Sequence, residues 1–335
     1  MRVSKVFSNV WKISLVGSQP PGNFGEGKVA IIGPVSRLRR GVEVLIVGAM
    51  KKIGVIVNTK RPCTDRVLDE LRGVAKGFAF ELFCDDEAVA QVLDAEYMPV
   101  ERFGNAVDVV LAMGGDGTVL YTSRMLYGSG VPILGINLGS LGFLTSVGDE
   151  NIFQALDAIA NGTFKVSERD MAECRIFKDG VLAGEECALN DVVLGWGRSS
   201  RIVTLKLLVD GEQVGTFMCD GMMVSTPTGS TGHSLSAGGP ILHPGIGGFG
   251  INVICPHTLS SRPLVVPISS LIEIEVVNTA KELILSSDGQ DNFRVERGGR
   301  IEIRRSPHRV KFLQLPEHSY FSVLAQKLHW RGSAL

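Results

Sequence analysis

The chain has 335 residues, of which 44% are hydrophobic and 21% charged, and its formal net charge is −1. This length allows one large domain or two ordinary ones, and we expect two. The charge gives no sign of a nucleic-acid partner, and no apolar run reaches the roughly 18 residues of a membrane span. The six cysteines form no Cys-x-x-Cys pair, so we expect reduced thiols in a soluble, cytoplasmic protein without a zinc site.

Residues 1–49 differ from the rest in charge. They hold seven Lys or Arg and two Glu, so their net charge is +5 and that of the remainder is −6. An Arg-rich leader can be a transit peptide, but no clear amphipathic helical pattern accompanies it here. We expect the folded protein to begin at Met50, and residues 1–49 to be disordered or an artefact of start-site choice.

After Met50, strand and helix patterns alternate, which is typical of a parallel sheet covered by helices on both faces. The predicted elements are strands over 53–57, 78–83, 107–111 and 131–137 and a helix over 64–76. Ligands of such sheets bind at the carboxyl ends of the strands. Asn58, Asn137 and a glycine turn at 114–118 are all expected at that edge.

The turn at 114–118 has the sequence Gly-Gly-Asp-Gly-Thr. Its glycines let the backbone approach a ligand, and free N–H groups at a helix start favour phosphate. We predict a phosphate-donor loop made by Gly114, Gly115, Gly117 and Thr118. Asp116 inside that loop would hold a metal or accept a proton from the group being phosphorylated. The alternative is an ordinary strand-to-helix turn in which Asp116 caps the helix.

A second glycine-rich loop follows at 138–145, where Phe143 would either stack on a base or belong to the core. A helix near 151–160 is expected to close the first domain. Apolar residues then alternate with period two at 203–209, 272–276 and 301–303, and Asp-Gly pairs at 179–180 and 210–211 predict hairpin turns. These patterns indicate antiparallel strands in a sandwich-like second domain.

The predicted domain boundaries follow from these patterns. We expect an α/β domain over 50–150 and a β-sandwich domain over 151–315. A last helix in 316–335 is expected to return to the α/β domain.

A second group of polar residues lies at 220–240, where hydroxyl side chains alternate with glycines. Short hydroxyl groups can make directed hydrogen bonds to a sugar, a phosphate or a base, and the alternative is a polar surface loop. The pair Asn190-Asp191 can contact an adenine edge and a ribose diol, or it can form a turn. Covalent hydrolysis is not expected, because Ser230 lacks the Gly-x-Ser-x-Gly context.

Together these motifs resemble NAD kinases. The matching pieces follow the family's order between residues 53 and 330, and they are 114–118, 137–145, 190–191, 220–231, 234–240, 256–260 and 288–290. The Gly-Gly-Asp-Gly element also occurs in diacylglycerol kinases and phosphofructokinases, whereas Thr-Pro-Thr-Gly-Ser-Thr with its Ser-Ala-Gly-Gly-Pro tail is specific.

The resemblance implies a Rossmann-like parallel α/β domain joined to a β-sandwich. It implies transfer of the γ-phosphoryl group of ATP, with Mg²⁺ or another divalent cation, to the 2′-hydroxyl of the NAD adenosine ribose to give NADP. It also implies a homodimer or homotetramer in which a neighbouring subunit contributes to the site.

By the same resemblance, Asp116 accepts the proton, and no side chain is assigned to the metal. For the mechanism we expect backbone N–H groups, Mg²⁺ and either Lys60 or Arg61 to neutralise phosphate charge. Asn190 and Asp191 would bind adenosine, Phe143 and Thr231 would line the base pocket, and Asp220 and Ser236 would serve the nicotinamide half. The full set expected against NAD is Asp116, Gly117, Phe143, Asn190, Asp191, Arg201, Asp220, Thr228, Thr231, Gly232, His233, Ser234, Leu235, Ser236 and Gln290.

Two positions depart from the family's pattern: Gly232-His233 replaces the usual Ala-Tyr, and Met218 stands where some members have a basic residue. Two alternative functions remain open. A lipid or sugar kinase could use the same glycine turn, and a dinucleotide-binding regulator or dehydrogenase could bind NAD without phosphate transfer. The latter is weakened because no Gly-x-Gly-x-x-Gly motif with a downstream acid is present.

Overall fold

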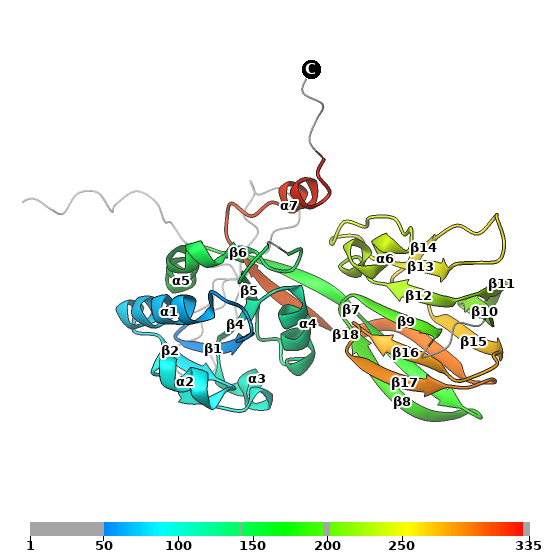
Figure 1. Cartoon of the computed structure of the whole chain (residues 1–335), viewed down its shortest axis with the longest axis horizontal. Helices are drawn as coiled ribbons and strands as arrows, with labels where there is room; N and C mark the ends of the chain where they lie inside the picture. Colours follow the sequence, from blue (N-terminus) through cyan, green and yellow to red (C-terminus); the bar gives the residue numbers. More distant parts are fainter. Residues whose placement is uncertain (1–49, 141, 197–201, 331–335) are drawn as a thin grey trace, which may run out of the picture.

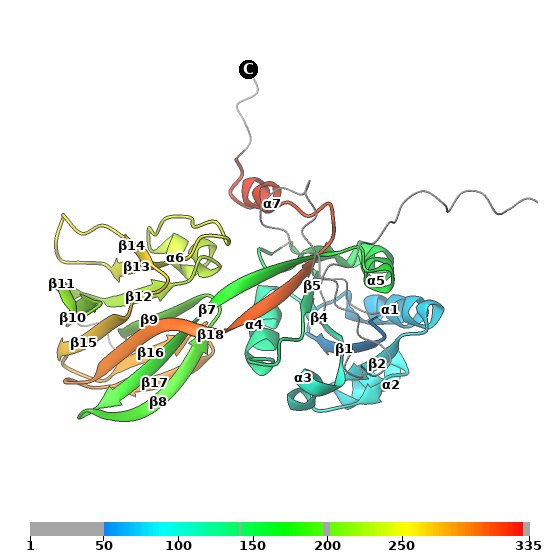
Figure 2. The same cartoon turned by 180° about the vertical axis from the view of Figure 1, so that it is seen from behind.

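The computed structural model describes residues 50–140, 142–196 and 202–330. An α/β part and a β part lie side by side, and two long strands, β7 (Lys165–Lys178) and β18 (Arg300–Gln314), run between them (Figures 1 and 2). The prediction for residues 1–49 lies outside the described residues. None of the helices in the described ranges is long and apolar enough to cross a membrane.

The α/β part is built on parallel strands in the order β5-β4-β1-β2-β3. Their bounds are β1 Lys52–Val57, β2 Glu81–Cys84, β3 Glu96–Tyr97, β4 Val109–Gly114 and β5 Ile133–Asn137, and the short β6 (Val147–Gly148) pairs with β5. Strand β4 is buried at every position, because helices cover both faces of the sheet. The strand expected over 78–83 begins only at Glu81, since α1 continues to Phe78 and Ala79 ends it in the left-handed conformation.

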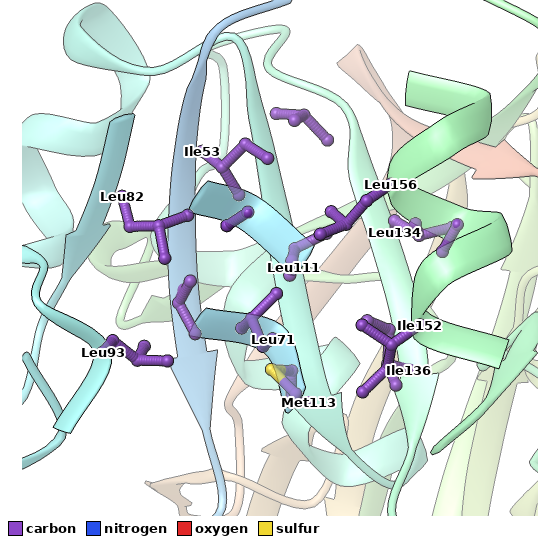
Figure 3. Packing of buried hydrophobic residues seen from close by; sticks show 14 of the residues in the cluster. Ile53, Leu71, Leu82, Leu93, Leu111, Met113, Leu134, Ile136, Ile152 and Leu156 are labelled. Atoms are coloured by element: carbon purple, nitrogen blue, oxygen red, sulfur yellow. The ribbon is translucent and has the colours of Figure 1, made fainter. Parts of the chain in front are cut away.

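Helices cover this sheet. Their bounds are α1 Thr64–Phe78, α2 Glu87–Leu93, α3 Phe103–Ala106, α4 Asp116–Met125 and α5 Ile152–Asn161, with 3₁₀ turns η1 Val100–Arg102 and η2 Asp149–Asn151. Leu71 of α1 and Leu156 of α5 pack with Leu111 of β4 in one apolar cluster (Figure 3). Helix α5 therefore shares the first core, which extends beyond residue 150.

The β part consists of two packed antiparallel sheets, as expected. One has the order β14-β13-β12-β9-β16-β17, with bounds β9 Asp191–Trp196, β12 Gly221–Ser225, β13 Gly248–Ile254, β14 Leu264–Pro267, β16 Leu283–Ser287 and β17 Asp291–Val295. The other contains β7, β18, β8 Val181–Ala188, β10 Val203–Val209, β11 Glu212–Cys219 and β15 Ile272–Asn278. Side chains of both sheets, such as Leu205 and Phe249, form one core.

The second of these sheets is continuous with the parallel sheet. Strand β18 pairs in parallel with β5 at Phe312 and Ile133, and antiparallel with β15. One 12-stranded sheet thus passes through both parts of the molecule. The separate domains expected from the sequence are therefore linked through backbone hydrogen bonds.

Short helices complete the fold: η3 (Gly229–Thr231), α6 (His233–Ser236) and the C-terminal α7 (Tyr320–Lys327). The last helix is present as expected. The rings of Tyr320 and Phe321 contact His243 of the β part, with centroids 5.1 and 5.6 Å from the imidazole. Packing of α7 against the α/β part stays a prediction.

Candidate active site

Asp116 joins the two glycine-rich loops. It is the first residue of α4, and the N-cap position before it is Gly115, where no side chain caps the helix. The alternative in which Asp116 caps the helix is therefore wrong. The Asp116 carboxylate instead accepts the backbone N–H groups of Phe143 (2.9 Å) and Leu144 (3.0 Å). Each carboxylate oxygen retains a further lone pair for a ligand.

Glycine is required where these loops approach each other. A Cβ atom on Gly142 would overlap the Asp116 carboxylate, and one on Gly114 would overlap the Thr118 hydroxyl. Gly114 does not have a positive φ, so close approach explains this glycine better than backbone conformation.

A cleft of about 470 Å³ opens beside this turn. Its walls are Ile56, Val57, Asn58, Arg61, Asp85, Asp86, Gly115, Asp116, Gly117, Thr118 and Tyr121. The Arg61 guanidinium lies 3.5 Å from the position of a Cβ on Gly115 and 3.7 Å from one on Gly139. It therefore faces both glycine loops, where a planar cation suits a phosphate. The cleft brings together three of the predicted phosphate-loop residues, and the fourth, Gly114, is the last residue of β4, directly before Gly115 in the chain.

A metal would find few protein ligands here. No group of three or more His, Cys, Asp or Glu side chains suited to a metal occurs in residues 50–140, 142–196 and 202–330. The carboxylates that line the cleft are Asp85, Asp86 and Asp116. Burial raises the pKa of Asp85, and Asp86 caps α2 by accepting the N–H groups of Ala88 and Val89. Such a site suits Mg²⁺ that arrives on phosphate oxygens, which it commonly does.

The Asn190-Asp191 pair is fixed to the turn that follows β12. The Thr226 N–H donates to the Asn190 carbonyl (2.8 Å), and the Thr226 hydroxyl donates to the Leu189 carbonyl (2.5 Å). Gly229 packs on the same backbone, where a Cβ would overlap the Asn190 carbonyl. The structure thus brings the pair against Thr226 and Gly229 of the hydroxyl-rich segment.

The side chains of the pair are available for a ligand. Oδ1 of Asn190 is buried without a hydrogen-bond partner among the described residues, and such an atom is costly unless a ligand satisfies it. Asp191 is 5% exposed. Burial, and then the charge of Asp288, raise the pKa of Asp191 to about 7. This carboxyl group can therefore either donate or accept a hydrogen bond near neutral pH.

The hydroxyl-rich segment is less open than its composition indicates. Ser230 is fully buried, donates to the Pro227 carbonyl (2.7 Å) and accepts the Leu242 N–H (2.9 Å), so it shapes the loop. Thr228 and Ser234 are also buried. The other predicted contacts lie nearer the surface: His233 and Ser236 are exposed, and Thr231, Gly232 and Leu235 are partly exposed.

The remaining predicted residues do not all lie at one place. Asp220 precedes β12, whereas Thr226 follows it, so about 17 Å of strand separates them. Arg201 lies outside the described residues. Phe143 donates its N–H to Asp116, and the residue is partly buried and lines a narrow hollow with Arg169, Phe312 and His318. Gly117 is exposed and lines the cleft beside Asp116.

An apolar cluster connects the two halves of the site. It includes Leu144, which follows Phe143, Leu189, which precedes Asn190, and Val119 of α4. Asp116 and the Asn190-Asp191 pair therefore project from elements that share one core.

The sequence interpretation missed the role of Asp288, the residue behind the pair. Its carboxylate accepts the N–H groups of Leu189 (2.8 Å), Asn190 (2.6 Å) and Asp191 (3.1 Å). Gln290, which was predicted, is partly exposed two residues later. The sequence feature that could have indicated this role is a third Asp-Gly pair, at 288–289. Unlike the pairs at 179–180 and 210–211, it lies within one of the pieces that match the family.

Comparison with known proteins identifies the family. Residues 53–164 match the model of the ATP-NAD kinase N-terminal domain, and residues 189–315 match that of the ATP-NAD kinase C-terminal domain. The chain is 37% identical over 282 residues to an NAD kinase of Syntrophotalea carbinolica, covering 84% of this chain and 99% of that one. An NAD kinase of Desulforamulus reducens is 36% identical over 285 residues, covering 84% and 99%.

Solved structures have the same fold. Yeast NADH kinase in complex with NADH superposes with a TM-score of 0.81 at 25% identity, over 92% of this chain and 94% of that one. An NAD kinase from Archaeoglobus fulgidus in complex with ATP superposes with a TM-score of 0.64 at 27% identity, over 84% and 100%. The domain matches, the sequence identity and the shared fold together show that this chain belongs to the NAD kinase family.

Proposed function

We propose that this protein is an NAD kinase, which transfers the γ-phosphoryl group of ATP to the 2′-hydroxyl of the adenosine ribose of NAD and forms NADP. The observation that carries the proposal is the position of Asp116. Asp116 lines the same cleft as Arg61 and the glycine turn. Helix α4, which begins at Asp116, shares an apolar cluster with Leu189, the residue before the Asn190-Asp191 pair. A carboxylate between a phosphate site and a dinucleotide site suits phosphate transfer to a hydroxyl.

Asp116 acts late in this reaction. A carboxylate is a much weaker base than an alkoxide, so removing the ribose proton before phosphate transfer is unfavourable. The loose transition state of phosphoryl transfer demands little activation of the nucleophile until its new bond forms. Asp116, held by two N–H groups, orients the 2′-hydroxyl and accepts its proton as the oxygen bonds to the γ-phosphorus, while the bond from that phosphorus to the β-phosphate oxygen breaks and ADP leaves.

The donor is ATP with a divalent cation. The glycine turn and the Arg61 guanidinium would hold the phosphates, and a divalent cation bound to the phosphate oxygens would supply further charge neutralisation. The complex of ATP with the Archaeoglobus fulgidus enzyme supports the choice of donor.

The active enzyme is a homodimer or homotetramer. Asp220 belongs to the residues expected against NAD, yet it lies at the far end of β12 from Thr226. A second subunit that supplied Asp220 would complete the nicotinamide end of each site, so the protein alone in solution should elute as a dimer or tetramer in size-exclusion chromatography with light scattering.

One assay separates the candidate functions. The purified protein is incubated with ATP and Mg²⁺ and with NAD, diacylglycerol or a sugar as acceptor. NADP formation is the expected result. Phosphorylation of the lipid or the sugar alone would identify the rival kinase, and NAD binding without NADP would identify a regulator or dehydrogenase.

A further inference from the structure

Three Asp-Gly turns in the β part have nearly the same backbone. Asp179, Asp210 and Asp288 have φ of 51°, 51° and 52°, and the glycine after each also has a positive φ. Asp and Gly suit such hairpin turns, so the turn alone accounts for the residue type at all three positions. The three side chains nevertheless make different contacts, and those contacts distinguish them.

The Asp179 side chain is at an exposed turn between β7 and β8. The Asp210 side chain accepts the Leu271 N–H (2.8 Å) and fastens its own hairpin to the segment before β15. Neither of these two turns lines the donor cleft, and neither is bonded to the Asn190-Asp191 pair. Both positions therefore serve as matched controls for the third turn.

The Asp288 side chain makes a contact of another kind. Its carboxylate accepts three consecutive N–H groups, those of Leu189, Asn190 and Asp191. The Asp288 N–H donates in turn to the Asp191 carbonyl (2.9 Å). Four hydrogen bonds thus fix the backbone from which the side chains of the Asn190-Asp191 pair project. Charge-assisted bonds of this kind are stronger than neutral ones.

We propose that Asp288 is a positioning residue for the dinucleotide, which holds the Asn190-Asp191 backbone so that both side chains face NAD. The inference rests on the proposed function of that pair. It assigns Asp288 no contact with ATP, because the donor cleft is lined by residues of the α/β part. Loss of the Asp288 carboxylate should therefore weaken the binding of NAD, the acceptor, and leave the binding of ATP, the donor, unchanged.

Asp288→Asn tests this in the full-length protein. Asparagine also favours a positive φ and retains one acceptor oxygen, so the turn should still form. The amide nitrogen cannot accept an N–H group, so at least one of the three bonds is lost and two donors face each other. We expect the dissociation constant for NAD, measured by titration calorimetry, and KM for NAD to rise roughly tenfold or more. KM for ATP should stay within about twofold of that of the wild type, and Asp288→Ala should show the larger effect on NAD.

The controls separate positioning from general stability. Asp210→Ala, which removes the acceptor of the Leu271 N–H, should lower the melting temperature without changing KM for NAD or for ATP. Asp179→Asn should change neither the melting temperature nor either KM. The inference is overturned if Asp288→Asn binds NAD as the wild type does, if it weakens NAD and ATP equally, or if neither variant at 288 folds. If the wild type binds NAD but forms no NADP, the proposed function is contradicted instead. The positioning role of Asp288 is then still tested by the calorimetric dissociation constant for NAD.

Discussion

The carboxylate of Asp116 occupies the space that a side chain on Gly142 would need. The two residues lie in different loops, and the Phe143 and Leu144 N–H groups hold the carboxylate there. The second glycine-rich loop is therefore a support for the first. Glycine is needed at 142 because a side chain there would collide with one functional group, the Asp116 carboxylate.

Replacing Gly142 tests this support. In Gly142→Ala the new methyl group would displace the Asp116 carboxylate from its two N–H donors, and we expect kcat to fall about 100-fold or more, since misplaced groups of this kind cost that much. KM for NAD should change little. Gly73→Ala is the control, because a Cβ there meets nothing within 4 Å and alanine favours the helix. Near-normal turnover of Gly142→Ala would show that the carboxylate position is not critical.

Arg61 should act on the donor. Its guanidinium faces both glycine loops and lines the cleft beside Asp116. A charge-assisted phosphate contact contributes about 1.5–3 kcal/mol, so Arg61→Ala should raise KM for ATP roughly tenfold or more and leave the affinity for NAD unchanged. Arg72→Ala, which removes a partly exposed arginine that pairs with Asp69 and donates to the Val92 carbonyl, should have no effect on either substrate. A higher KM for NAD alone would place Arg61 in the wrong half of the site.

Asp191 should make stability depend on pH. Its pKa is raised to about 7 in the folded protein, above its value of about 4 in an unfolded chain, so the folded state holds a proton that the unfolded state releases. The stability from this group is complete below pH 4 and is lost as the pH rises through 7. Asp191→Asn lacks this titration, so its free energy of unfolding relative to the wild type should increase by roughly 2 kcal/mol between pH 5 and pH 8.

Urea unfolding of both proteins at several pH values measures the difference, with Asp179→Asn as a control. A constant difference between Asp191→Asn and the wild type would mean that Asp191 is ionised throughout the range and that its burial does not raise its pKa.

Much of the fold was predictable because it follows from local patterns. The strand over 53–57, the helix from Thr64 and the period-two alternation of β10 and β15 depend on side-chain spacing, and the structure confirms them. The start of β2 was wrong because Phe78, an apolar residue beside a strand pattern, ends α1 instead. The pairing of β18 with β5 could not be foreseen, since it joins residues far apart in the chain.

The site divides in the same way. Glycine turns and the Asn190-Asp191 pair are visible as motifs, because close backbone approach restricts the residue type. The burial of Ser230 and Ser234 is not visible, because hydroxyl groups serve a loop's own backbone as readily as a ligand. The use of Asp288 is hidden for a related reason: a turn alone explains an aspartate before glycine, and only the fold shows which N–H groups its side chain reaches.

The most direct test of the account is the comparison of Asp116→Asn with the wild type, in which NADP formation from NAD, ATP and Mg²⁺ and calorimetric NAD binding are measured on the same preparations. Asparagine keeps the size of the side chain but cannot take up the ribose proton, so turnover should fall about 10²- to 10⁴-fold while NAD still binds. Turnover close to that of the wild type would contradict the assignment of Asp116 as the proton acceptor.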